Sequence, residues 1–375
     1  MSILVIHVGA QKCGSTTIQN AIDNLMRTDS SQKLKFRIFP PGLAVRMHQQ
    51  FKAIPDHELD IQFAEICKDD VCLVLSNEIL GNYPDVVAKL VERASKLIPE
   101  LTVVIIGYTR SQYSYYLSEY KQWYFRAKGR LRADINFFQK NDLSYEIFLP
   151  HERRMFVNSV MSFEEQRQGD WYEYYQSLEK AILAFSGNVI IKSSHIPTVD
   201  FNYSLISDFI RKVGVGDIEE VSLSGLPSRS NPSFNPLLCE SVALHICNDS
   251  LDSSFLPGPH ESNDLIQKAS DLFRLEQKLL GKLPGSADLL EVAKATIAQN
   301  FAESNEKYCR KYGANSLYFL QEQGQCDLSS IGSRKKLFDF ARKIHNCRNL
   351  DDVRKYENKL ICELDQVAYI FETAS

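Results

Sequence analysis

The sequence predicts an α/β fold with three layers, in which helices cover both faces of a mostly parallel central sheet and a largely helical part follows. Two observations carry this prediction. Short apolar, β-branched runs alternate with stretches of helical periodicity over the first 215 residues. From about residue 232 onward, strand-like runs are missing and helical patterns prevail. The strand candidates are residues 3–8, 71–75, 101–108 and 188–192.

Length and composition indicate a globular protein with a sizeable core. The 375 residues are 44% hydrophobic and 24% charged, and the formal net charge is −4. That acidic balance argues against a dedicated nucleic-acid binder, which is normally basic. We expect a core domain over residues 1–235 and a helical C-terminal extension over 236–375 that packs on it.

Cysteine usage and the N-terminus predict a cytoplasmic protein. The nine cysteines include no Cys-x-x-Cys pair and no cluster with histidine at zinc spacing, which favours reduced thiols over a disulfide framework. The apolar run at the N-terminus is too short for a signal peptide, and no run is long enough to span a membrane.

The predicted elements follow one another as strand, loop and helix. Residues 3–8 form an apolar run that reaches Gly9, and apolar residues then recur at helical spacing from Ile18 to Met26. The second strand candidate leads into Ser76-Asn77-Glu78, and a helix is expected over 86–97. Further helices are expected from Ser111 to about Tyr124 and over 171–185.

The loop after the first strand has the chemistry of an anion site. A glycine-containing turn that enters a helix presents backbone amides and the positive end of the helix dipole. Lys12 adds a cation, Gly14 allows the turn, and Ser15, Thr16 and Thr17 add hydroxyl donors. The loop is not a Walker A motif, because its lysine precedes the second glycine. The alternative is an ordinary strand-to-helix turn with a surface lysine.

The order Lys12-Cys13-Gly14-Ser15-Thr16-Thr17 directly after a first strand resembles the 5′-phosphosulfate loop of sulfotransferases that use 3′-phosphoadenosine-5′-phosphosulfate (PAPS). His7-Val8-Gly9 resembles the bacterial and carbohydrate-type branches of that family, whose fold is P-loop-like. Cys13 stands where these proteins commonly have threonine. It is either an oxidation-sensitive thiol with a lowered pKa or a small buried side chain that fills space.

A second motif resembles the family's 3′-phosphate site. Arg110 ends the third predicted strand and Ser118 lies two turns into the next helix, so that both are expected to meet one phosphate. Arg229-Ser230-Asn231-Pro232-Ser233 is similar to a later family stretch. There, Asn231 and Ser233 either donate to the 3′-phosphate or cap the following helix.

Glu78 is the candidate general base. It follows the second strand, at the sheet edge where open α/β folds bind ligands, and Ser76-Asn77-Glu78 resembles a family motif. The alternative is a helix-capping carboxylate. Lys12 is expected to stabilise the departing phosphate oxygen. His7 and His48 are weaker base candidates, and His7 is expected to be a core histidine.

The resemblance implies a sulfotransferase that moves a sulfuryl group from PAPS to an acceptor hydroxyl, with PAP as product and no metal. The acceptor expected from the resemblance is a carbohydrate or glycolipid. The alternatives are an ATP-dependent P-loop kinase and a non-catalytic nucleotide-binding scaffold. The basic stretch from Lys121 to Arg132, which includes Trp123 and Phe125, is either a groove for an anionic glycan or, as charge runs usually are, a solvated helix end. The oligomeric state stays open.

Overall fold

The computed structural model groups the chain into two compact units, which we call the α/β unit and the helical unit. The α/β unit comprises residues 1–110, 169–230 and 303–318, and the helical unit comprises the remaining segments. Both units therefore contain chain from either side of residue 235, and the boundary expected there stays a prediction. The structure describes residues 3–9, 13–28, 34–38, 46, 49, 55–63, 72–98, 101–165, 168–183, 189–196, 201–214, 234, 236–248, 283–313 and 333–361.

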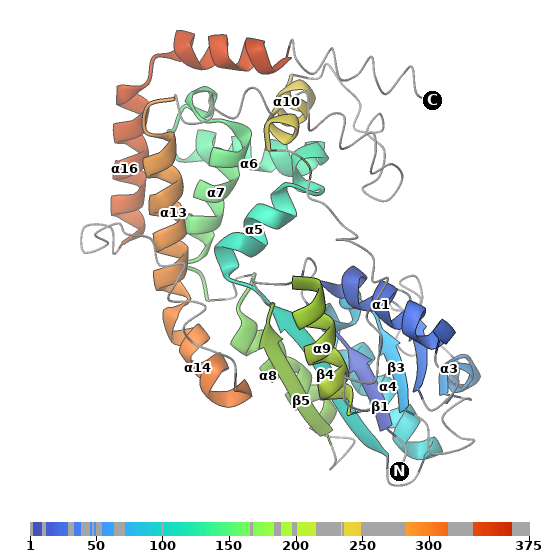
Figure 1. The fold of residues 1–375 in the computed structure, drawn as a ribbon. Helices are drawn as coiled ribbons and strands as arrows, with labels where there is room; N and C mark the ends of the chain where they lie inside the picture. The colour runs from blue at the N-terminus through green and yellow to red at the C-terminus, as the bar shows by residue number, and fades with distance from the viewer. Residues whose placement is uncertain are drawn as a thin grey trace, which may run out of the picture. The chain divides into compact units, whose positions relative to one another are not determined.

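The α/β unit is built on a five-stranded parallel sheet with the strand order β2-β3-β1-β4-β5 (Figure 1). Ile3 of the central strand pairs with Cys72 on one side and Thr102 on the other. The three central strands are almost wholly buried, as their unbroken apolar sequences predict. The strands are β1 (Ile3–His7), β2 (Leu34–Ile38), β3 (Cys72–Ser76), β4 (Thr102–Thr109) and β5 (Val189–His195).

The strand β2 was not among the predicted elements. Its sequence, LKFRI, alternates apolar and basic residues instead of forming an apolar run. Among the described strands it lies at one edge of the sheet, where it pairs with β3. Basic side chains are common on edge strands because they discourage pairing with another chain. Unbroken apolar runs predict buried strands, and the alternating sequence of this edge strand does not have that pattern.

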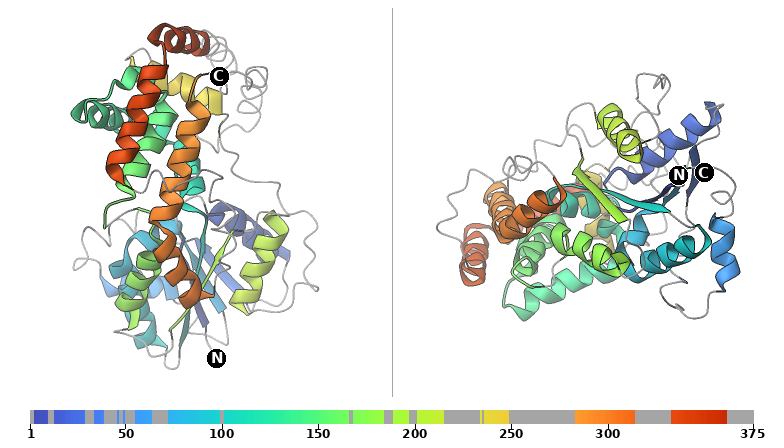
Figure 2. Two further views of the ribbon diagram at one scale, coloured as in Figure 1. Left: turned by 90° about the vertical axis from the view of Figure 1, so that its left-hand side faces the viewer. Right: turned by 90° about the horizontal axis from the view of Figure 1, so that it is seen from below.

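Helices cover both faces of this sheet, which confirms the three-layer α/β prediction. The helices α1 (Ser15–Thr28) and α9 (Phe201–Val213) contact each other on one face. On the other face α4 (Pro84–Leu97) packs between α3 (Asp56–Phe63) and α8 (Trp171–Leu183), as Figure 2 shows. The helices expected over 86–97 and 171–185 correspond to α4 and α8.

After residue 232 the described segments are helical, as predicted, and the helical unit also contains helices from residues 112–161. Its apolar core joins α7 and α13 with α6 and α16 through Phe138, Phe156, Leu289 and Leu337. Within the described ranges, no helix combines the length and the apolar content needed to cross a membrane. The main elements are α5 (Gln112–Tyr120), η3 (Tyr124–Arg126), α6 (Lys128–Lys140), η4 (Tyr145–Ile147), α7 (Pro150–Met161), α10 (Pro236–Cys247), α13 (Ser286–Asn300), α16 (Arg334–Cys347) and a helix over 350–361.

The helix expected from Ser111 to Tyr124 is shorter than predicted. Ser111 is its N-cap and accepts a hydrogen bond from the Ser114 amide at 3.3 Å. The helix ends at Tyr120, and a separate 3₁₀ turn begins at Tyr124. Tyr124 is held there by a 2.9 Å hydrogen bond from its hydroxyl to Asp134 of α6. A tertiary contact therefore overrides the tyrosine periodicity.

A buried ion pair ties the helical unit together. Arg348 makes two 2.8 Å hydrogen bonds to the Glu152 carboxylate and further bonds to the carbonyls of Pro284 and Ile147. The Ser286 hydroxyl joins both charged groups. Burial alone raises the pKa of Glu152, but the hydrogen bonds and charge of Arg348 hold it below its ordinary value. Each charge is thus compensated where water is excluded.

Candidate functional site

The candidate site lies at the carboxyl edge of three neighbouring strands in the α/β unit. β1 lies between β3 and β4 in the sheet. Gly9 follows β1, Glu78 follows β3, and Arg110 follows β4. From β1 the chain proceeds to the β2 side of the sheet, whereas from β4 it proceeds toward β5. Open parallel sheets bind ligands where the connections diverge in this way. The topology therefore brings together three segments that the sequence singled out separately.

The turn from β1 into α1 has the backbone geometry of an anion-binding loop. Gly14 has φ of 87°, which favours glycine, and α1 begins at Ser15. The Ile18 amide donates to the Gly14 carbonyl at 3.1 Å, so the first helical turn is regular and directs the positive end of its dipole to this edge. Ser15 and Thr17 are buried and Thr16 is half-buried. Lys12 lies outside the described residues.

Arg110 and Glu78 both influence the Cys13 thiol at this edge. Burial raises the pKa of the Cys13 thiol to about 12. The charge and hydrogen bonds of Arg110 oppose that rise, and the Glu78 carboxylate adds to it. The raised pKa favours the alternative of a small, neutral buried side chain that fills space. Glu78 is half-buried and opens the short 3₁₀ helix η2 (Glu78–Asn82).

Two buried polar atoms at this edge have no hydrogen-bond partner among the described residues: Ser15 Oγ and Arg110 Nε. A Cβ added at Gly9 lies 3.7 Å from Ser15 Oγ, so the β1 end and the helix start are in close contact. Buried donors are normally paired, and exceptions call for an explanation. A guanidinium and a hydroxyl at a helix N-terminus together suit a phosphate or sulfate oxygen.

The backbone of Arg110 is fixed by α8. The indole Nε1 of Trp171 donates to the Arg110 carbonyl at 2.7 Å. Trp171 is itself buried at the start of α8, where Asp170 accepts a hydrogen bond from the Glu173 amide at 3.1 Å. This capping contact sets the helix entry, and the helix in turn positions the arginine.

A buried polar network behind Arg110 was not anticipated from the sequence. The Thr109 hydroxyl lies 2.8 Å from His195 Nδ1 and 3.1 Å from the Tyr308 hydroxyl. The Tyr308 hydroxyl also lies 2.5 Å from Ser193 Oγ. Burial lowers the pKa of His195 to about 4, so this ring is neutral at pH 7. Tyr308 comes from α14 (Ala302–Tyr312), far along the chain, and no local sequence signal connects it to β4.

His7 is a core histidine, as predicted. It is 1% exposed, its Nδ1 lies 2.8 Å from Ser76 Oγ, and its ring packs edge-on against Phe209. Burial lowers the pKa of His7 to about 3. The residue therefore stays neutral and joins β1 to β3. His48 lies outside the described residues.

The remaining predicted site residues do not fall in the described α/β unit. Ser118 is half-buried on α5 of the helical unit. Asn231 and Ser233 lie outside the described residues. In the basic stretch, Lys128 and Arg130 are exposed, while Phe125 is fully buried against Phe234. The exposed part of the stretch, at the start of α6, fits the solvated helix end, and Phe125 is not available to stack on a sugar.

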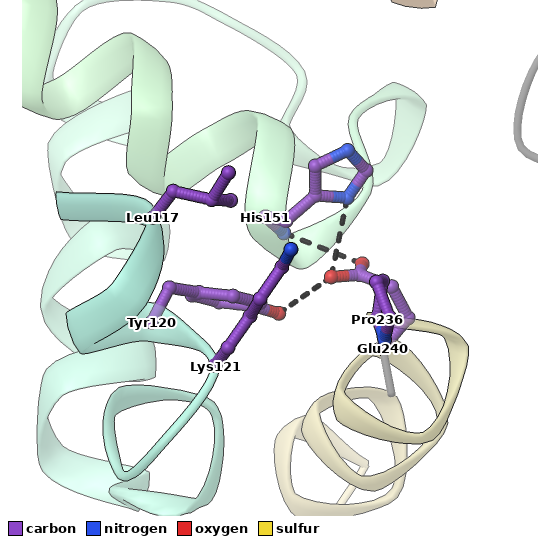
Figure 3. Close-up of a pocket in the computed structure, with 6 residues that line it drawn as sticks. All are labelled: Leu117, Tyr120, Lys121, His151, Pro236 and Glu240. Atoms are coloured by element: carbon purple, nitrogen blue, oxygen red, sulfur yellow. Dashed lines mark hydrogen bonds and ion pairs between the residues drawn. The ribbon is translucent and has the colours of Figure 1, made fainter. Parts of the chain in front are cut away.

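The helical unit contains a second polar cluster, which the sequence did not reveal. Figure 3 shows the buried Glu240 carboxylate between α10, α5 and α7, where it accepts from the Tyr120 hydroxyl at 2.7 Å and lies 3.1 Å from His151 Nδ1. Burial raises the pKa of Tyr120 and lowers that of Lys121, which lines the same cavity. Burial alone lowers the pKa of His151, but Glu240 raises it above its ordinary value. The cavity measures about 40 Å³, which is too small for an organic substrate.

Among the described residues, no three histidine, cysteine, aspartate or glutamate side chains gather into a metal-ligand set. Comparisons with protein-family models, with curated proteins and with solved structures find no match for this chain.

Proposed function

We propose that the protein is a sulfotransferase that transfers a sulfuryl group from PAPS to an acceptor hydroxyl, with a carbohydrate or glycolipid as the acceptor class. The observation that carries this proposal is the pair of unpartnered buried donors, Ser15 Oγ and Arg110 Nε, at the carboxyl edge of the sheet. They are contributed by the two segments whose sequences resemble the family's phosphate motifs. The parallel sheet with helices on both faces is compatible with a P-loop-like fold.

The residues of this edge have distinct roles in the proposed reaction. The α1 N-terminus, with Ser15, Thr16 and Thr17, binds the phosphosulfate, and Gly14 lets the backbone approach it. Arg110 binds the 3′-phosphate, and the parts expected there for Ser118, Asn231 and Ser233 stay predictions from the sequence resemblance. Cys13 packs beneath the loop. PAPS supplies a sulfuryl group on a phosphate anhydride oxygen, and the chain's residues need only orient and neutralise it.

Glu78 accepts the proton of the acceptor hydroxyl. The acceptor oxygen forms a bond to sulfur while the bond from sulfur to the phosphate oxygen breaks, and PAP leaves. Lys12 neutralises the charge that develops on that phosphate oxygen. Glu78 is half-buried beside the Cys13–Arg110 pair, which supports a carboxylate position close to the bound sulfuryl group. A general base of this kind contributes about 10²- to 10⁴-fold to the rate.

Calorimetric binding of PAP and of Mg-ATP tests the proposal. We expect PAP to bind the wild type, and Arg110→Ala to weaken it about 10- to 100-fold, because a charged hydrogen bond contributes about 1.5–3 kcal/mol. Arg211→Ala, an exposed arginine on α9, is the matched control and should bind PAP as the wild type does. If Mg-ATP binds and PAP does not, the chain is a kinase and the proposal is wrong.

The catalytic roles need a separate experiment. With PAPS and an acceptor found by screening, Glu78→Gln should lower kcat while leaving PAP affinity unchanged, and Lys12→Ala should lower both. If PAP binds but Glu78→Gln turns over like the wild type, Glu78 is not the base. If PAP binds and no acceptor is ever sulfated, the scaffold alternative gains support.

A further inference from the structure

A pocket of about 340 Å³ opens in the helical unit, apart from the cavity of Figure 3. It is lined by α6, η4, α7, α10 and the helix over 350–361, all of which belong to this unit. Its volume lies at the lower end of the range for small-molecule sites. The proposed sulfotransferase reaction assigns it no role.

One of the groups that line this pocket is a buried guanidinium with spare hydrogen-bonding capacity. Arg153 is only 4% exposed. Among the described residues it makes a long hydrogen bond of 3.4 Å to the Tyr145 carbonyl, a weak bond of 3.9 Å to Cys247 Sγ and a contact of 5.6 Å with the centre of the Tyr145 ring. Good N–H···O bonds measure about 2.7–3.2 Å. Arg348 of the same unit, by contrast, makes five bonds of 2.7–2.9 Å. Arg153 therefore keeps donors for a ligand in the pocket.

The charges around the pocket balance. Two arginines, Arg153 and Arg354, line it together with two carboxylates, Glu146 and Glu357. They are interspersed: burial raises the pKa of Glu357, Arg153 and Arg354 oppose this rise, and Glu146 adds to it. An anionic ligand meets two carboxylates here, and a cationic ligand meets two guanidiniums. The lining therefore favours a ligand without net charge.

The hydrogen-bonding groups match hydroxyls. Guanidinium groups only donate, carboxylates only accept, and the Asn248 amide does both. A hydroxyl donates and accepts, so it is satisfied beside either kind of group. Apolar side chains such as Leu244 complete the wall and suit the C–H face of a ring.

We propose that this pocket binds a neutral polyhydroxylated ligand of the size of one sugar residue, held by Arg153 and Arg354 as donors and by Glu146 and Glu357 as acceptors. The inference goes beyond the proposed function and does not depend on PAPS, because each of its residues belongs to the helical unit.

Ligand-observed NMR and calorimetry on the full chain test this site with the methyl glycosides of glucose, galactose and mannose at millimolar concentration. Glucuronate and glucosamine are the charged probes of the same size. We expect at least one neutral glycoside to bind more tightly than both charged probes. Glu357→Gln should weaken that glycoside about tenfold, the loss typical of a hydrogen bond to a charged group. The same variant should improve glucuronate binding, because it leaves the arginines in excess.

Asp352→Asn is the matched control, since this carboxylate lies on the same helix, is 58% exposed and does not line the pocket. It should bind the glycoside as the wild type does. The proposal is overturned if no neutral glycoside binds, if a charged probe binds most tightly, or if Glu357→Gln and Arg354→Gln leave glycoside affinity unchanged. Because PAP plays no part in this experiment, its failure leaves the sulfotransferase proposal untouched.

Discussion

Two sites that each combine an arginine with a serine, one in either unit, differ in whether their buried polar groups are paired. In the helical unit, Arg348 and Glu152 satisfy each other and recruit Ser286 and two backbone carbonyls. In the α/β unit, Arg110 Nε and Ser15 Oγ are buried at the sheet edge without a partner among the described residues. Each site combines an arginine with a serine, and in each the serine is the first residue of a long helix.

This difference separates groups that stabilise the fold from groups that suit a ligand. Removing one partner of a satisfied buried pair leaves the other charge uncompensated. Removing an unpartnered donor takes away a group whose desolvation cost is not offset by a hydrogen bond in the folded chain. Stability measurements and binding measurements on matched variants should therefore diverge between the two regions.

The largest expected effect is on the buried ion pair. Arg348→Ala leaves the Glu152 carboxylate buried without its cation, so we expect the free energy of unfolding to fall by about 3–5 kcal/mol. Urea denaturation followed by circular dichroism measures it. Arg342→Ala, which removes a 52% exposed arginine from α16, should cost less than about 1 kcal/mol. Equal losses in the two variants would show that the buried ion pair contributes no more to the free energy of unfolding than an exposed one.

Acid should destabilise the α/β unit through His7. The pKa of this buried ring is about 3 in the folded chain, against an ordinary 6.5. Between these two pH values the ring is protonated in the unfolded chain and neutral in the folded chain. Stability is therefore lost as the pH falls below about 6.5. Between pH 6.5 and about 4.5 the loss from His7 alone is about 2–3 kcal/mol, at about 1.4 kcal/mol per unit.

The His7→Gln variant isolates this contribution, because glutamine does not titrate and can still hydrogen-bond Ser76. The stability of the variant should depend less steeply on pH over this range. His195 contributes in the same direction, so some acid sensitivity should remain. A His7→Gln slope equal to the wild type contradicts the assignment.

The smallest effects come from a matched pair of serines. Ser286→Ala removes a hydroxyl that bonds both Glu152 and Arg348, and we expect a loss of about 1–3 kcal/mol. Ser15→Ala removes an unpartnered hydroxyl and should change the free energy of unfolding by less than about 0.5 kcal/mol. PAP affinity should show the reverse order, with a loss only in Ser15→Ala. A larger loss of stability in Ser15→Ala than in Ser286→Ala would contradict the distinction between a stabilising serine and a ligand-binding serine.

Much of the α/β unit could be predicted from the sequence because its central strands are buried on both faces. Burial demands unbroken apolar runs, and β1, β3 and β4 have them. The loop before α1 was recognisable because a positive φ and an anion site require glycine and hydroxyl residues close together in the chain. The strand β2 was missed because an edge strand lacks that pattern.

The polar networks could not be predicted, because their members are distant in sequence. Tyr308 meets Thr109, and Glu240 meets Tyr120 and His151, across more than 80 residues in each case. The pocket around Arg153 likewise combines segments from residue 135 to residue 358. Nothing in the local composition of these helices distinguishes such positions from ordinary surface or core residues.

The sequence by itself determined the buried strands β1, β3 and β4 and the helices α4 and α8, because burial and backbone geometry act on neighbouring residues. It also determined the chemistry available at the first loop and after β4. Only the tertiary structure decided that Cys13, Arg110 and Glu78 share one edge, and that the Cys13 thiol is buried and neutral. The physical reason is that strand order and desolvation depend on how the whole chain packs, and a linear pattern of residues does not contain them.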